Sequence, residues 1–201
     1  MITLYTTASS PNGQKIRIML AETGLAYEPV LVDLHEGANR RPEYLALNPA
    51  GTVPALTDSE TGAQVFETGA MLIYLAEKSG RFLPTTQPDR AHVFKWLLYE
   101  AATVGPVLVN LYHLMYAPED AGDAMAQAGR HRLTDAASVI DGQLDGGEYL
   151  AGSCSIADFA LLPWMLMLED FADIPLTRFP NIDRWSETMQ SRPGVASALA
   201  G

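Results

Sequence analysis

The 201-residue sequence contains a single cysteine, Cys154, and this scarcity excludes several classes of protein. One cysteine cannot form an intrachain disulfide framework. The Cys-x-x-Cys pair of a thioredoxin-type redox protein is also absent, so disulfide chemistry here would have to use the thiol of a bound ligand. No apolar run reaches the roughly 18 residues of a membrane-spanning helix, and residues 1–10 lack the pattern of a signal peptide. We therefore expect a cytoplasmic protein without a membrane partner.

Basic residues are also few. The chain has 13 Lys and Arg against 24 Asp and Glu, and its formal net charge is −11. Because phosphate backbones are bound by clustered Lys and Arg, we expect no nucleic-acid partner. The charge is unevenly distributed. Residues 1–86 contain 6 basic and 9 acidic side chains, and residues 87–201 contain 7 basic and 15 acidic ones. The first part is therefore the better host for an anionic ligand.

What is present begins with alternating strand and helix patterns in residues 1–80. Short β-branched and aromatic runs predict strands, and apolar residues at helical spacing predict helices. The expected order is βαβαββα, with Asp58–Gly62 as the hairpin turn and Gly24 and Gly80 closing two helices. The segments are residues 2–6, a helix ending at Gly24, 27–33, 42–47, 53–57, 64–66 and 67–79.

The second half has a different pattern. Residues 81–88 include two prolines and are typical of a linker, and helical periodicity continues from residue 89. We expect helices at about 89–116, with a kink at Gly105-Pro106, and at about 120–145, 155–170 and 181–191. The sequence thus predicts an α/β domain at 1–80, a linker at 81–88 and an all-α helical bundle domain at 89–201.

The loop after the first strand is the first candidate site. Ser9 and Ser10 stand just before a helix start, followed by Asn12. Backbone N–H groups and the positive end of the helix dipole stabilise an anion at such a place, including a thiolate. A hydroxyl donating to the sulfur of a ligand would lower its pKa further. The simpler alternative is that the serine only caps the helix, and one hydroxyl can do both.

Two further motifs are candidates for ligand binding. Pro54 opens a strand and can follow a cis peptide bond, which would let Val53 offer its backbone N–H and C=O to an extended peptide. The alternative is an ordinary edge-strand proline. At the start of the third helix, Thr68 can bind a carboxylate and Glu67 an ammonium group. The alternative for this pair is a simple helix cap.

These motifs occur together in an order that resembles the glutathione transferase superfamily over nearly the whole chain. The resembling segments are LYTTASSPNGQKIRIMLAETGLAYE, NPAGTVPAL, FETGAMLIYLAEK and SIADFALLPW. The resemblance implies the glutathione transferase fold, in which a thioredoxin-like, glutathione-binding domain precedes a helical domain. The Ser-Pro-Asn-Gly turn is most similar to the Nu class and its fungal prion-like relatives, which carry Thr-Pro-Asn-Gly.

The resemblance also implies residue roles at the sulfur of glutathione. Ser10 stands where that class has a threonine whose hydroxyl meets the sulfur, and Asn12 matches an asparagine near it. The loop is one residue longer than in the class and Ala8 replaces a proline, so Ser9 remains an alternative to Ser10. Asn39 matches a glutamine that touches the ligand.

For the rest of glutathione, the resemblance implies that Val53 pairs with the cysteinyl backbone and that Pro54 is cis. Glu67 and Thr68 match the Glu-Ser pair that holds the γ-glutamyl end. Thr52 replaces a lysine or asparagine that contacts the glycyl carboxylate.

The helical half provides fewer specific expectations. The Nu class has an arginine in its helical domain that has no counterpart at the same position of this sequence. Arg130 and Arg132 lie close to that position and are candidates to replace it, but the simpler interpretation is that both lie on the solvated surface. Tyr99, His113 and Tyr116 are alternatives for lining the pocket of the second substrate.

Three functions therefore remain open. The first is a glutathione transferase that uses glutathione as co-substrate, no metal, and a small electrophile as second substrate. The second is a glutathione-dependent disulfide-bond oxidoreductase, and the third is a non-catalytic interaction module with the same fold. The resemblance implies a homodimer in each case.

Overall fold

The computed structural model describes residues 1–115 and 123–200. The chain divides into two compact units, Met1–Leu83 with Arg192–Gly201, and Pro84–Ser191. The fold expected from the sequence is confirmed, since a four-stranded mixed sheet with its helices precedes a helical unit. The predicted helix ends at residues 116 and 120 lie outside the described residues. No helix in the described part of the chain is long and apolar enough to span a membrane.

The first unit has the predicted βαβαββα order. The sheet order is β2-β1-β3-β4, in which β1 is parallel to β2 and antiparallel to β3, and β4 is antiparallel to β3. The elements are β1 (Ile2–Thr6), α1 (Pro11–Thr23), β2 (Tyr27–Leu31), the 3-10 turn η1 (Ala38–Arg40), α2 (Pro42–Leu45), β3 (Ala55–Asp58), β4 (Ala63–Phe66) and α3 (Thr68–Ser79).

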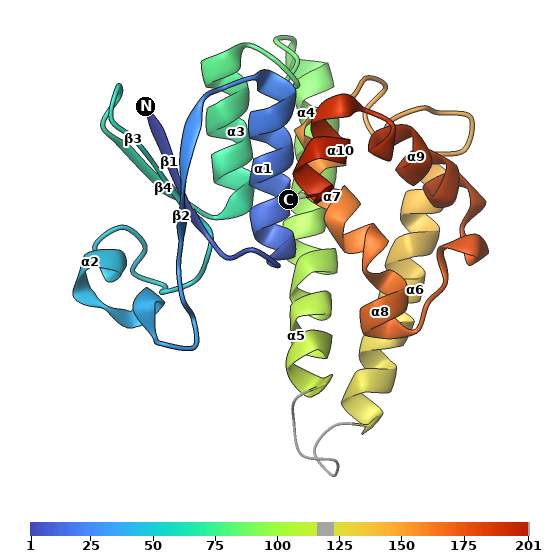
Figure 1. The fold of residues 1–201 in the computed structure, drawn as a ribbon. Helices are drawn as coiled ribbons and strands as arrows, with labels where there is room; N and C mark the ends of the chain where they lie inside the picture. The colour runs from blue at the N-terminus through green and yellow to red at the C-terminus, as the bar shows by residue number, and fades with distance from the viewer. Residues whose placement is uncertain (116–122, 201) are drawn as a thin grey trace. The chain divides into compact units, whose positions relative to one another are not determined.

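Helices cover both faces of this sheet. Alternate residues of β1, Ile2 and Leu4, are buried, and α1 and α3 lie side by side on one face (Figure 1). The short helix α2 lies on the other face, where Tyr44 packs with Val32 and Ala55. Helices therefore lie against both faces of the sheet, and the inner strands β1 and β3 are largely buried, while the outer strands β2 and β4 keep exposed residues.

The last helix also belongs to the first unit. α10 (Pro193–Ala200) packs on α1, and Arg192 Nη2 forms an ion pair with Glu22 Oε2 at 2.5 Å. A Cβ at Gly194 would lie 2.8 Å from Glu22 Oε1, so the two helices approach closely. The sequence analysis assigned these residues to the helical domain, because helical periodicity does not show which neighbour a helix packs against.

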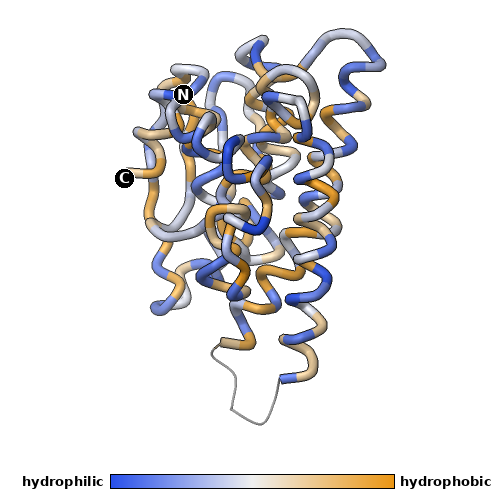
Figure 2. The backbone as a smooth tube through the Cα atoms, turned by 90° about the vertical axis from the view of Figure 1, so that its right-hand side faces the viewer, coloured by the Kyte–Doolittle hydropathy of each residue, from blue (hydrophilic) through white to orange (hydrophobic). Residues whose placement is uncertain are grey.

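All regular elements in the described part of the second unit are helical. Hydrophobic and hydrophilic residues alternate along its helices in Figure 2, as expected when one face of a helix is buried. Its elements are α4 (Gln87–Tyr99), the π-helical turn η2 (Glu100–Val104), α5 (Gly105–Met115), α6 (Asp123–Gln143), α7 (Ile156–Leu166), α8 (Leu168–Ala172), the 3-10 turn η3 (Leu176–Arg178) and α9 (Pro180–Gln190).

The buried helix α7 begins with a capping box. The Asp158 carboxylate accepts hydrogen bonds from the Ser155 N–H at 2.9 Å and from Trp185 Nε1 at 3.0 Å. Burial raises the pKa of Asp158 above its usual range, and these hydrogen bonds oppose that shift. This capping box therefore joins the start of α7 to α9.

The predicted kink near Gly105 takes the form of a π-helical turn just before it. Glu100 is buried, and its Oε1 accepts a hydrogen bond from Trp164 Nε1 at 2.7 Å. A Cβ at Gly105 would lie 2.9 Å from the same oxygen. The missing side chain at Gly105 thus leaves room for the buried carboxylate.

Candidate functional site

Three of the predicted motifs meet at one edge of the sheet. β1 ends beside the start of β3, where Ala55 pairs with Phe66, the last residue of β4. The segments Ser9–Asn12, Val53–Pro54 and Glu67–Thr68 therefore all adjoin this edge. Both α1 and α3 begin there, so the unpaired N–H groups and positive dipole ends of two helices lie at the same edge. Such an arrangement favours an anionic ligand.

Ser10 is the N-cap of α1. Its Oγ accepts a hydrogen bond from the backbone N–H of Gly13 at 3.2 Å, which confirms the capping role. The bond uses a lone pair of the hydroxyl oxygen, so the hydroxyl hydrogen can still be donated to a ligand. Ser9 precedes the cap and is exposed.

The loop between β1 and α1 is held from two sides. A Cβ at Gly13 would lie 2.2 Å from Thr6 Oγ1, so the first turn of α1 packs directly on the end of β1. The Arg17 guanidinium donates to the carbonyl oxygens of Thr7 at 3.3 Å and Ala8 at 3.0 Å. Burial lowers the pKa of Arg17. The loop residues before Ser10 thus have a defined position in the protein.

Asn12, in the first turn of α1, has a charged neighbour that the sequence analysis missed. Lys15 Nζ donates to Asn12 Oδ1 at 2.7 Å, and the lysine side chain is 0% exposed. A lysine three residues after an asparagine would ordinarily be read as a surface residue. Ile18 and Met19, three and four residues after Lys15, lie on the same face of the helix and are buried, and they were the signal that it faces the interior.

The Val53-Pro54 peptide bond is cis, as the resemblance implied. Val53 lies outside the paired residues of the sheet, which begin at Ala55 in β3. The carbonyl oxygen before it, that of Thr52, accepts hydrogen bonds from Tyr44 Oη at 2.6 Å and from Asn48 Nδ2 at 2.8 Å. Burial raises the pKa of Tyr44 to about 12, so the phenol stays a donor.

Asn39, the residue predicted to contact the ligand, supports the loop that precedes Val53. Its Nδ2 donates to the carbonyl oxygen of Gly51 at 2.7 Å, and Arg40 Nη1 lies 3.4 Å from the carbonyl oxygen of Ala50. Gly51 has a φ of 63°, which favours glycine. α2 and the turn before it therefore fix the backbone that leads to Val53.

Glu67 has an unusual backbone conformation at the start of α3. Its φ is 68° and its ψ is 118°, and it is not a glycine. Such conformations cost about 1–3 kcal/mol and often cluster at functional sites. The side chain of Glu67 makes no capping bond to α3 and is exposed, and Thr68 is the first helical residue. The carboxylate is therefore available to a cationic group at the sheet edge.

The predicted residues of the helical half occupy different environments. Arg130 and Arg132 are both exposed on α6, which agrees with the simpler surface interpretation. Tyr99 lies on α4, where burial and Asp135 raise its pKa. His113 is exposed near the end of α5, and Tyr116 lies outside the described residues.

Two family profiles match the chain. Residues 1–77 match the glutathione S-transferase N-terminal domain, and residues 104–193 match the glutathione S-transferase C-terminal domain. Together the two matches cover most of the chain and follow the order in which the two units occur.

Individual relatives match the chain over nearly its full length. The disulfide-bond oxidoreductase YfcG of Escherichia coli is 36% identical, with 99% of this chain and 94% of that protein covered. A glutathione transferase of Burkholderia graminis, solved with two glutathione molecules per subunit, is 31% identical, with 100% and 88% covered and a TM-score of 0.90. The nitrogen regulation fragment of the yeast prion protein Ure2p is 27% identical, with 100% and 96% covered and a TM-score of 0.93.

Proposed function

Because the chain belongs to the glutathione S-transferase family, we propose that it is an enzyme that binds glutathione at this sheet edge. It stabilises the glutathione thiolate and transfers it to an electrophilic substrate. The observation that carries the proposal is the meeting of Ser10, Val53 and Glu67 at one edge where two helices begin. Glutathione is a peptide with a thiol, a cysteinyl backbone and a zwitterionic γ-glutamyl end, and these three motifs offer a partner for each of these parts.

The proposed roles follow from the groups present. At the sulfur, Ser10 or Ser9 donates a hydroxyl hydrogen and Asn12 an amide hydrogen. Val53, after which Pro54 is cis, offers its backbone to the cysteinyl part. In the same proposal Glu67 and Thr68 bind the γ-glutamyl end, and Thr52 and Asn39 lie on the side of the glycyl end.

The energy required is modest. A free thiol has a pKa of about 8.5, and each unit of lowering corresponds to about 1.4 kcal/mol of preferential thiolate stabilisation. A hydrogen bond to a charged group contributes about 1.5–3 kcal/mol, and a helix N-terminus about 0.3–1 kcal/mol. Two donors at the amino end of α1 are therefore sufficient for a lowering of about two units.

The thiolate has two alternative reactions. In conjugation it displaces a leaving group from an electrophile, which forms a C–S bond and releases the group as an anion. In disulfide exchange it attacks one sulfur of a disulfide and releases the other as a thiolate, and a second glutathione then completes the reduction as glutathione disulfide forms. Two similarities support disulfide exchange as the alternative reaction. YfcG is named a disulfide-bond oxidoreductase, and the Burkholderia graminis relative was solved with two glutathione molecules per subunit.

A non-catalytic module is the other class of function, and its support is the likeness to the Ure2p fragment. Calorimetric titration with glutathione separates an enzyme from a module that has lost the glutathione site. We expect saturable heat and a rise in the thermal unfolding midpoint at millimolar ligand. Neither effect would be observed if the fold served association alone. Within the family we assign the chain to the Nu class on its Ser10-Pro11-Asn12-Gly13 turn, and we place it in the cytoplasm on its single cysteine.

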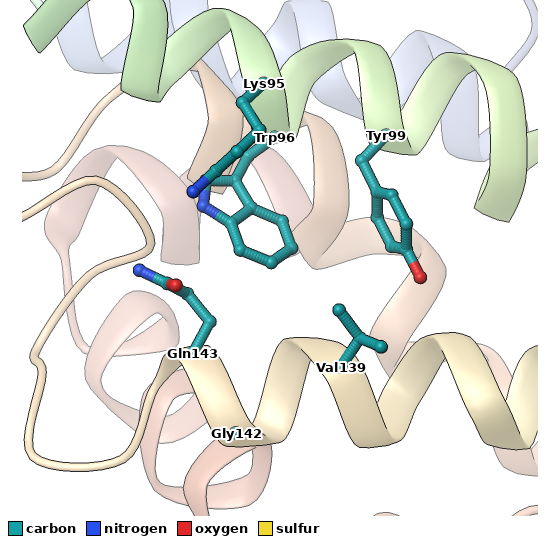
Figure 3. A pocket seen from close by; sticks show the side chains of 6 residues that line it. All are labelled: Lys95, Trp96, Tyr99, Val139, Gly142 and Gln143. Carbon is teal, nitrogen blue, oxygen red and sulfur yellow. The ribbon is translucent and has the colours of Figure 1, made fainter. Parts of the chain in front are cut away.

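The proposal includes a homodimer, supported by a groove of about 440 Å³ on the second unit. Figure 3 shows Trp96 and Tyr99 of α4 facing Val139 and Gln143 of α6 across it. Trp96 Nε1 is buried and has no hydrogen-bond partner among the described residues, and Val139 is exposed although apolar. A second copy of the chain that covers this groove would shield Val139 from water.

Sedimentation of the Val139→Glu variant tests the dimer. We expect the unaltered protein to sediment as a dimer and this variant as a monomer, because a carboxylate cannot be buried there without a partner. Met125→Glu is the matched control, since it also replaces an exposed apolar residue of α6. A monomeric unaltered protein would contradict the dimer and leave glutathione binding untouched.

A further inference from the structure

Lys15 is a fully buried charged residue beside the proposed sulfur site. It lies on α1, one turn after Asn12, and it is 0% exposed. Burying an ammonium group costs several kcal/mol unless hydrogen bonds compensate. Substituting an apolar residue of similar size would avoid this cost, so a buried lysine at this place calls for a reason.

The contact between Lys15 and Asn12 offers a reason for burying the lysine. An ammonium group has three donors and no acceptor. The amide atom that lies 2.7 Å from Lys15 Nζ must therefore be the oxygen, Oδ1. With the oxygen held by the lysine, the Nδ2 group and its two hydrogens point to the other side of the amide. Without the lysine, the amide could rotate by half a turn and present its oxygen there instead.

The difference matters for an anionic sulfur. A thiolate is stabilised by an N–H donor and destabilised by a carbonyl oxygen at the same position. Asn12 is only partly buried and lies in the first turn of α1, next to the amino end of the helix. Ser10 caps the same turn.

We propose that Lys15 is a positioning residue that holds the Asn12 amide with its nitrogen toward the ligand sulfur. This inference rests on the proposed function, since it requires glutathione at the amino end of α1. Lys15 does not touch the sulfur itself. It acts through Asn12, and it ensures that the site offers a donor rather than an acceptor.

The test compares three variants in the full-length protein. Lys15→Met keeps the length of the side chain and removes the donors, Lys15→Arg keeps the donors, and Asn12→Ala removes the amide. The readout is the pKa of glutathione bound to each variant, followed by the ultraviolet absorbance of its thiolate. We expect Lys15→Met to raise this pKa by about one unit and to lower kcat about tenfold at neutral pH, with a smaller change in KM for glutathione. Lys15→Arg should retain most of the effect.

The double variant tests whether Lys15 acts through Asn12. In the Asn12→Ala background, Lys15→Met should change the pKa of bound glutathione no further. A merely structural lysine would lower the thermal unfolding midpoint and leave the pKa of the bound thiol unchanged, and that result would overturn the inference. So would an equal rise of the pKa in both backgrounds.

The outcomes also separate this inference from the proposed function. If the unaltered protein gives no calorimetric heat with glutathione, the proposed function fails. If the unaltered protein and Lys15→Met both bind glutathione and lower the pKa of its thiol equally, only the proposed role of Lys15 fails. Should Lys15→Met not fold, the side-chain amide resonance of Asn12 in the unaltered protein takes its place. A resonance that shifts on addition of glutathione supports the inference, and one that does not move contradicts it.

Discussion

At the scale of single residues, the proposed site consists of hydrogen-bond donors that the fold holds in place. Ser10 has two tasks in this account, because the same oxygen that caps α1 can carry a hydrogen to the sulfur. Tyr44 and Asn48 converge on one carbonyl, that of Thr52, directly before Val53. The neutral phenol of Tyr44 is a permanent donor because burial raises its pKa to about 12.

Replacement of Ser10 by Ala is expected to have two separable effects. Loss of the cap should lower the free energy of unfolding by about 1 kcal/mol. Loss of the donor should raise the pKa of bound glutathione, measured by thiolate absorbance. Ser9→Ala is the matched control, since Ser9 is exposed and lies outside the cap. If only Ser9→Ala raises the thiol pKa, Ser9 is the donor; if neither does, the serines serve the helix alone.

Replacement of Tyr44 by Phe tests the support of the loop before Val53. The Thr52 carbonyl keeps its bond from Asn48, so we expect a loss of about 0.5–1.5 kcal/mol in stability and weaker glutathione binding by calorimetry. Tyr74→Phe is the control, because Tyr74 Oη also donates a hydrogen bond, to Asp58 Oδ2 at 2.7 Å, away from the site. Equal affinities for glutathione in both variants would show that Tyr44 has no part in binding.

These residue-scale features were only partly predictable. Ser10, Asn12, Val53 and Glu67 belong to short local motifs, which a sequence displays directly. The partners of Thr52 come from α2, and their convergence depends on how α2 packs on the sheet. Burial of Lys15 is likewise a tertiary property, which its neighbours in the sequence only hint at.

At the scale of elements, the end of β3 away from the site is anchored to α3. The Asp58 carboxylate is buried and lies 2.8 Å from Lys78 Nζ of α3. Hydrogen bonds from Lys78 and Tyr74 hold the pKa of Asp58 well below its usual range, and the carboxylates of Asp58 and Glu60 raise the pKa of Lys78. This ion pair fastens the hairpin to the helix whose first residues form part of the proposed site.

The pH dependence of stability follows from the lowered pKa of Asp58. As the pH falls below about 4, the unfolded chain takes up a proton at this carboxyl before the folded protein does. The stabilisation is therefore present above that pH and is lost in acid. We expect Asp58→Asn to be less stable at neutral pH and to lose less stability on acidification, measured by denaturant unfolding across pH.

The matched control for Asp58 is Glu60→Gln. Glu60 also pairs with Lys78, at 2.6 Å, but its side chain is exposed. Exposed ion pairs contribute about 0–1 kcal/mol, so this variant should resemble the unaltered protein. If Asp58→Asn and the unaltered protein lost the same amount of unfolding free energy on acidification, the acid sensitivity could not be assigned to Asp58.

Elements with strong local signals were predicted best. Gly24 and Gly80 end α1 and α3 in the left-handed conformation, as expected. The segment at 89–116 was predicted as one helix with a kink, and its described part is two helices around a π-helical turn. The buried Glu100–Trp164 contact accompanies this turn, and its partners are 64 residues apart.

At the scale of the whole molecule, the order of strands and helices predicted a two-part chain of the glutathione transferase fold. Periodicity could not place α10, because a short apolar helix fits any apolar surface, and its ion pair joins Glu22 to Arg192 across 170 residues. The function follows from the first unit, where the topology gathers distant motifs at one sheet edge.

The most direct measurement is the pKa of the glutathione thiol when bound to the protein, obtained from the ultraviolet absorbance of the thiolate as the pH is raised. The account predicts a value about one to two units below that of the free thiol, and a smaller lowering in the Asn12→Ala variant. An unchanged pKa in the bound ligand, or no binding of glutathione at all, would contradict it.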